Sequence, residues 1–123
     1  MNWAGLQRIA EAEINATLRA LPSQVKARAE RLPITLEPLP NDELLADNVE
    51  PDTLGLFVGE AFPDGEGMAT PLPPQIILFL ENLWDFADAD EAIYREEIRI
   101  TLLHELGHYL GLNELEIEDR GLD

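Results

Sequence analysis

Residues 101–114 read TLLHELGHYLGLNE, and this stretch decides how the rest of the chain is interpreted. Within it, His104, Glu105 and His108 form the pattern H-E-x-x-H. Histidines four positions apart lie on one face of a helix, about one turn from each other, so both imidazoles can bind one metal ion. Glu105 lies about 100° further round the helix, beside the metal, where it can take a proton from a metal-bound water. These two histidines are the only ones in the chain.

The residues after this pattern favour a catalytic metal site. Gly111 follows His108 by three positions, where a helix can end because glycine adopts the left-handed conformation. Glu114 follows and completes H-E-x-x-H-x-x-G-x-x-E, so we expect it to be the third ligand. Three other acidic residues of the tail remain alternatives: Glu116, Glu118 and Asp119. Three protein ligands leave a fourth position for water, as in catalytic zinc sites.

The charge of the chain restricts its partners. The net charge is −17, and it is unevenly distributed. Residues 1–32 contain five basic and three acidic side chains (net +2), whereas residues 33–123 contain three basic and 22 acidic ones (net −19). Such a field repels phosphate backbones and anionic lipids, so neither nucleic acid nor a membrane is an expected partner. A basic peptide fits the field better, although solubility alone would explain the charge equally well.

Length and composition predict a single domain over residues 1–123. The chain contains no cysteine, which excludes disulfides and thiolate metal sites. The first 25 residues lack an uninterrupted apolar region, so no secretory signal is expected. The longest apolar run, residues 76–80, is far too short to span a bilayer. A cytoplasmic protein is therefore expected.

Hydrophobic periodicity predicts helices and strands in the first two thirds of the chain. We expect helices over residues 3–21 and 23–31, and strands over residues 34–37, 54–59 and 75–81. Glycines in the second of these strands would permit bends or a close backbone approach. Continuous apolar sequence in the third is typical of a strand buried on both faces. Residues 41–53 are expected to be a surface connection and residues 61–74 a loop or hairpin.

A long helix is expected to carry the histidines. It should begin at a capping box formed by Asp88 and Glu91 and run over residues 89–110. Most of its circumference is apolar, which predicts burial and makes polar groups costly unless a cation compensates them. The preceding residues 82–87 should form a helical turn with Trp84 and Phe86 in the core.

With these motifs, residues 53–122 resemble the small bacterial zincin-like metallopeptidases, which carry H-E-x-x-H-x-x-G near the C-terminal end. The resemblance implies an α+β fold with a small mixed sheet of three to four strands, packed against N-terminal helices and a long active-site helix. It also implies one zinc per chain, held by His104, His108 and Glu114, with Glu105 as the general base. The chain departs from the larger metzincins, because its third ligand is not histidine and no methionine follows the motif.

The function expected from this resemblance is zinc-dependent hydrolysis of peptide bonds. A peptide or protein substrate would add as a strand to a sheet edge, for which residues 54–58 and the loop 60–70 are the candidates. Tyr94 and Tyr109 are available to stabilise an oxyanion, but Tyr109 lies on the apolar side of the helix, where packing is expected. One alternative is a non-catalytic zinc-binding interaction module. Another is an acidic protein that binds a basic partner and has an incidental motif.

Overall fold

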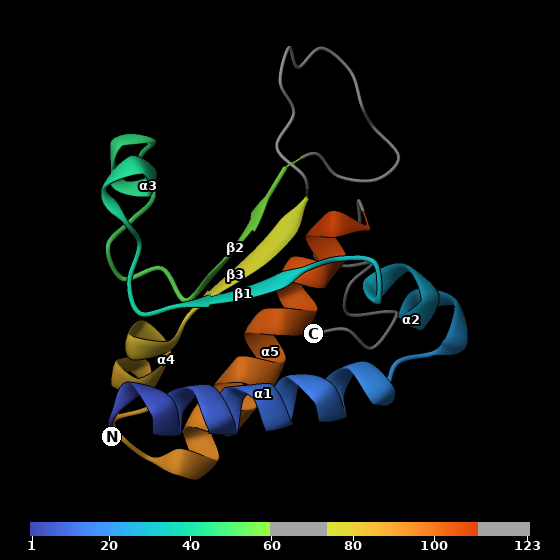
Figure 1. Ribbon diagram of the computed structural model, residues 1–123, viewed down its shortest axis with the longest axis horizontal. Coiled ribbons are helices and arrows are strands. Elements are labelled where there is room, and N and C mark those ends of the chain that lie inside the picture. The colour runs from blue at the N-terminus through green and yellow to red at the C-terminus, as the bar shows by residue number, and fades with distance from the viewer. Residues whose placement is uncertain (60–73, 111–123) are drawn as a thin grey trace.

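The computed structural model describes residues 1–59 and 74–110 of the chain (Figure 1). This part is an α+β fold with five helices and three strands, which confirms the predicted class. The elements follow the order α1 (Trp3–Arg19), α2 (Ser23–Ala29), β1 (Ile34–Glu37), α3 (Asp42–Ala46), β2 (Gly55–Val58), β3 (Gln75–Phe79), α4 (Leu80–Phe86) and α5 (Glu91–Tyr109).

The three described strands form a mixed sheet in the order β1-β3-β2. β1 pairs with β3 in parallel, and β2 pairs with β3 in antiparallel orientation. The central strand β3 is the most apolar of the three, and its residues Ile76, Leu78 and Phe79 have no exposed surface. This burial confirms the interpretation of its continuous apolar sequence, and it leaves β1 and β2 as the two edges of the described sheet.

The core lies between one face of the sheet and the helices α1, α4 and α5 (Figure 1). α5 contacts α1 as well as β2 and β3, so it is held from two sides. Leucine and isoleucine provide most of the buried side chains, which come from all these elements: Leu6, Ile9, Ile14, Ile76, Leu78, Leu80, Leu83, Ile98, Leu102 and Leu106. The periodic positions of the two long helices therefore contribute a large part of the core, as amphipathic helices do.

The start of α5 differs from the prediction by two residues. Asp88 and Ala89 have φ values of 53° and 59°, a left-handed conformation that cannot belong to the first turn of an α-helix. Asp90 is the N-cap instead, and its side chain accepts a hydrogen bond of 3.0 Å from the Ile93 N–H. The helix itself, from Glu91 to Tyr109, is otherwise close to the predicted range.

The transition from β3 to α4 also differs from the prediction. The strand ends at Phe79 and not at residue 81, and α4 begins directly at Leu80. Trp84 packs against the core as expected, but Phe86 is 60% exposed, so its predicted burial was wrong. By the 3.6-residue period, Phe86 lies about 120° from Leu80 and thus off the face that Leu80 and Leu83 turn to the core.

The predicted surface connection over residues 41–53 contains the short helix α3. Its N-cap is Asn41, whose side-chain oxygen accepts a hydrogen bond of 2.9 Å from the Leu44 N–H. None of its residues is buried, so the surface location was correct and only the helix was missed. In the described parts of the chain, no helix has the length and hydrophobicity needed to cross a membrane.

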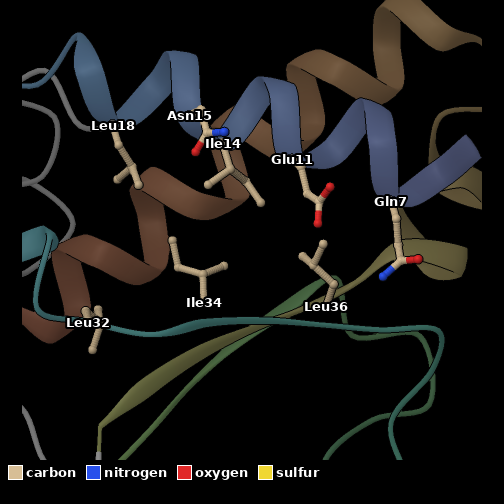
Figure 2. Close-up of a pocket in the computed structure, with 8 residues that line it drawn as sticks. All are labelled: Gln7, Glu11, Ile14, Asn15, Leu18, Leu32, Ile34 and Leu36. Carbon is tan, nitrogen blue, oxygen red and sulfur yellow. The ribbon is translucent and has the colours of Figure 1, made fainter. Parts of the chain in front are cut away.

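A cavity of about 550 Å³ lies between α1 and β1 (Figure 2). Ile14 and Leu18 from α1 face Ile34 and Leu36 from β1 across it, and Glu11 lies at its rim. The residues that line it include neither histidine of the chain. The predicted chemistry therefore belongs elsewhere, at the C-terminal half of α5.

Candidate metal centre

The C-terminal half of α5 brings together His104, Glu105 and His108. One potential ligand atom from each of the three lies within 4.8 Å of the other two. The two imidazole ring centroids are 4.7 Å apart, and the ring planes are nearly perpendicular at 83°. His104 and Glu105 are half-buried and His108 is exposed, so a small ligand can reach the group. The helical spacing of four thus produces the predicted convergence of the two histidines.

This donor set fits zinc. Zinc is bound by imidazole nitrogens and carboxylate oxygens at about 2.0–2.2 Å, and both types of donor lie here within 4.8 Å of one another. The backbone is fixed on the opposite side of the helix, where Leu102 and Leu106 are buried. The two imidazoles are therefore presented on a rigid element, which favours a defined metal geometry.

The predicted third ligand lies outside the described residues. Glu114 belongs to the segment 111–123, as do the alternatives Glu116, Glu118 and Asp119. The loop 60–70, which was expected to contribute to substrate binding, is also outside them. Residues 55–58 are described and form β2, which is an edge of the sheet that the described strands form, as strand addition requires.

β2 lies directly along α5 and contacts the site. The Glu105 carboxylate accepts a hydrogen bond from the backbone N–H of Phe57, with 3.0 Å between Oε1 and N. The rings of Phe57 and Tyr109 are tilted by 57°, with centroids 5.6 Å apart. Gly55 allows this approach, since a Cβ on Gly55 would lie 2.5 Å from Thr101 Cγ2. The expectation that a glycine in this strand permits close backbone approach is therefore confirmed at Gly55.

Sequence reasoning missed the contact between Phe57 and Glu105. A backbone N–H carries no signal in the sequence, and its direction depends on the pairing of β2 with β3. The only available hint was the glycine in the strand, which predicts a close neighbour without identifying it.

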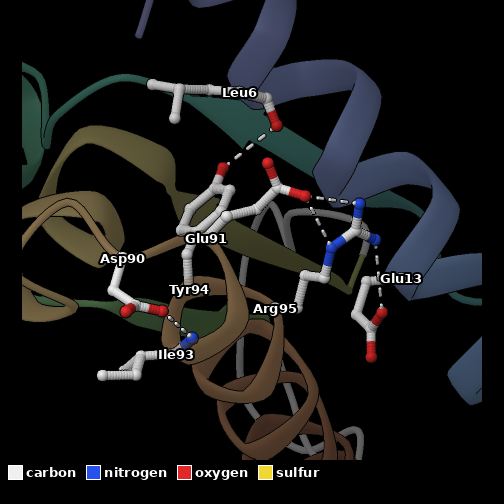
Figure 3. Close-up of polar contacts among 7 residues, drawn as sticks. All are labelled: Leu6, Glu13, Asp90, Glu91, Ile93, Tyr94 and Arg95. Carbon is white, nitrogen blue, oxygen red and sulfur yellow. Dashed lines mark hydrogen bonds and ion pairs between the residues drawn. The ribbon is translucent and has the colours of Figure 1, made fainter.

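The two tyrosines of α5 have structural surroundings. Tyr94 is fully buried, and its hydroxyl donates a hydrogen bond of 3.0 Å to the carbonyl of Leu6 in α1 (Figure 3). Burial raises the pKa of Tyr94 well above its ordinary range, because the phenolate would lose its hydration. Tyr109 packs on Phe57 and the core, as expected. The Tyr94 hydroxyl already donates its hydrogen bond within the core, about four helical turns before His108. It is therefore unsuited to stabilise an oxyanion at the histidines.

Comparison with known proteins agrees with this geometry. No curated protein was found that matches the chain. A family model described as zincin-like metallopeptidase matches residues 29–122, which include α5 and all three strands.

Proposed function

Because the chain belongs to the zincin-like metallopeptidase family, we propose that it is a zinc-dependent peptidase whose active site lies on α5. His104 and His108 hold the metal together with Glu114, one zinc per chain. Glu105 is the general base. The observation that carries this proposal is the convergence of the three α5 side chains within 4.8 Å.

The chain's own residues have distinct roles in this mechanism. Zinc, when bound, polarises the scissile carbonyl and makes water a stronger acid. Glu105 accepts a proton from the attacking water and returns it to the leaving amine, so one carboxylate serves both proton transfers. Its position one residue after His104 places it beside the ligands without requiring it as a ligand.

The substrate is an extended peptide that lies beside β2. An edge strand offers backbone groups for pairing, and β2 is the edge that contacts α5. The net charge of −19 over residues 33–123 attracts cationic peptides and speeds their encounter, an effect that salt screens. Basic peptides should therefore be cleaved faster than acidic ones at low ionic strength, with a difference that shrinks at high ionic strength.

The substitution Glu105→Gln tests the catalytic proposal. Glutamine has nearly the shape of glutamate but does not accept a proton at neutral pH, so turnover should fall by roughly 10²–10⁴-fold at unchanged zinc content. The matched control is Glu96→Gln, on an exposed position of the same helix, which should keep wild-type turnover. The measurement is cleavage of a peptide library at equal, verified zinc content. No turnover in the wild type would favour the non-catalytic zinc module instead.

A second pair of variants tests the third ligand. Glu114→Ala should weaken zinc binding, whereas Glu116→Ala should leave it unchanged, because only Glu114 has the expected spacing from His108. Zinc titration of both variants separates them, and loss of zinc from Glu116→Ala alone would reassign the ligand.

A further inference from the structure

The edge strand β2 turns part of its backbone toward α5. In an antiparallel pair, residues alternate between positions that bond the partner strand and positions that point away from it. The Phe79 N–H donates to the Leu54 carbonyl at 3.0 Å, so Leu54 is a bonded position. The register pairs Gly55 with Leu78 and Phe57 with Ile76. Gly55 and Phe57 are therefore the positions whose N–H and C=O groups point away from β3.

Glu105 accepts a hydrogen bond from one of these outward-pointing groups, the Phe57 N–H. Its Oε1 lies 3.0 Å from the Phe57 nitrogen, within hydrogen-bonding distance, and both residues are half-buried. A hydrogen bond to an ionised carboxylate is stronger than one between neutral groups, and partial burial reduces competition from water. One oxygen of the proposed base is thus fixed by a backbone group of a strand that is itself fixed to β3.

Gly55 sets the distance over which this bond forms. Four residues of helix and two residues of strand both span about 6–7 Å. Phe57 lies two residues after Gly55, and Glu105 lies four residues after Thr101. Close packing of Gly55 on Thr101 therefore brings Phe57 opposite Glu105. A side chain on Gly55 would meet Thr101 Cγ2 at 2.5 Å and Leu78 Cδ2 at 3.2 Å, so either the strand or the Thr101 side chain would have to shift. The Phe57 ring, against Tyr109, extends the same alignment by one more turn.

We propose that the Phe57 N–H is a positioning group for the general base and that Gly55 is the residue that sets its distance. This inference rests on the proposed peptidase function. A carboxylate held through one oxygen has little rotational freedom to lose before proton transfer, and misplacement of a reacting group is costly for rate. β2 thus serves catalysis through its backbone, independently of any pairing with substrate.

Amide hydrogen exchange tests the contact without substrate. In the full chain, with and without zinc, the Phe57 amide should exchange at least about tenfold faster in Glu105→Ala than in the wild type. The Leu56 and Val58 amides bond to β3 and should keep their rates, as should all three amides in the control Glu96→Ala. Equal exchange of the Phe57 amide in wild type and Glu105→Ala would overturn the proposal.

A proline and an alanine variant of Phe57 test the effect of this N–H on the rate of catalysis. Phe57→Pro removes the ring and the N–H, whereas Phe57→Ala removes only the ring. Proline removes no hydrogen bond of the β2–β3 ladder here, because the Phe57 N–H does not belong to it. We expect a kcat about tenfold lower for Phe57→Pro than for Phe57→Ala at equal zinc content, with KM within about twofold. Equal kcat values would overturn the proposal.

A rescue experiment keeps the test valid if the proline variant does not fold. Gly55→Ala should lower kcat, and the added change Thr101→Ser, which removes Cγ2, should restore part of it. An undiminished kcat in Gly55→Ala would contradict the role of Gly55. Absence of turnover in zinc-loaded wild type would overturn the peptidase function together with this role. If the wild type is active, the kcat values of these variants test the positioning role alone.

Discussion

The two halves of α5 use their polar side chains for different purposes. In the N-terminal half, Asp90 caps the helix, Tyr94 bonds the backbone of α1, and Arg95 pairs with Glu91 and Glu13 (Figure 3). These groups attach α5 to its own first turn and to α1. These polar groups therefore hold the helix in the fold.

In the C-terminal half, the polar side chains instead gather on one side of the helix. His104, Glu105 and His108 converge there, and the described contact of Glu105 with β2 involves a backbone group. The polar side chains that attach α5 to the fold and those proposed to act in the metal site therefore lie in different halves of the same helix. Substitutions of these polar side chains in the first half should change the free energy of unfolding, and substitutions of the polar side chains in the second half should change zinc affinity and turnover.

The largest effect is expected from His108→Ala in the C-terminal half. Loss of a ligand should weaken zinc binding by more than about 100-fold, since even the loss of a residue that hydrogen-bonds to a ligand weakens metal binding by about 10–100-fold. The unfolding free energy of the metal-free protein should change by less than about 0.5 kcal/mol, because His108 is exposed. Zinc titration against a chelator and urea unfolding in chelator measure the two quantities. Unchanged zinc affinity would remove His108 from the site.

The opposite pattern is expected from Tyr94→Phe in the N-terminal half. This change deletes a buried hydrogen bond to the Leu6 carbonyl and should cost about 1–2 kcal/mol of unfolding free energy. Zinc affinity and turnover of the folded protein should stay at wild-type values. The control is Tyr109→Phe, because the Tyr109 hydroxyl makes no hydrogen bond within the described residues, and its stability should change by less than about 0.5 kcal/mol. A loss of zinc in Tyr94→Phe would show that the two halves are coupled.

Alkaline pH should reveal the same buried phenol. Burial raises the pKa of Tyr94, so the folded state keeps the proton that the unfolded state releases near pH 10. The stability that depends on this proton is fully present below about pH 10 and is lost as pH rises further, by about 1.4 kcal/mol at pH 11. Urea unfolding at pH 9 and pH 11 should show this loss in the wild type but a smaller one in Tyr94→Phe. Parallel curves for the two proteins would contradict the assignment.

Local patterns in the sequence were enough to predict the parts of the fold that depend on periodicity. The apolar run over residues 76–80 predicted a buried strand, and the helical spacing of His104 and His108 predicted that the two imidazoles lie together. In both cases the relevant neighbours lie within one turn of helix or one strand. The period of the element then determines the face on which each side chain lies.

Features that the hydrophobic period does not encode were not predictable in this way. The exposure of Phe86 follows from where α4 begins, which the unbroken apolar sequence conceals. The left-handed Asp88 and Ala89 delay the start of α5, although neither is glycine. The bond between Phe57 and Glu105 depends on the register of β2 against β3 and on the packing of β2 against α5, 48 positions away along the chain.

The smallest effect is expected from Arg95→Ala, and it tests whether the N-terminal half is held by its core or by its charges. Arg95 is 40% exposed, 2.9 Å from Glu91 and 4.0 Å from Glu13 of α1. Exposed pairs of this kind contribute about 0.2–1 kcal/mol, and salt screens them. Arg99→Ala is the control, because Arg99 pairs only within α5 in the described structure, with Glu96 at 3.8 Å. We expect urea unfolding to show a loss of about 0.5 kcal/mol for Arg95→Ala that shrinks in 1 M salt. A loss above about 2 kcal/mol would mean that the link from α5 to α1 is ionic, and the contribution assigned to Tyr94 and the buried leucines would then be too large.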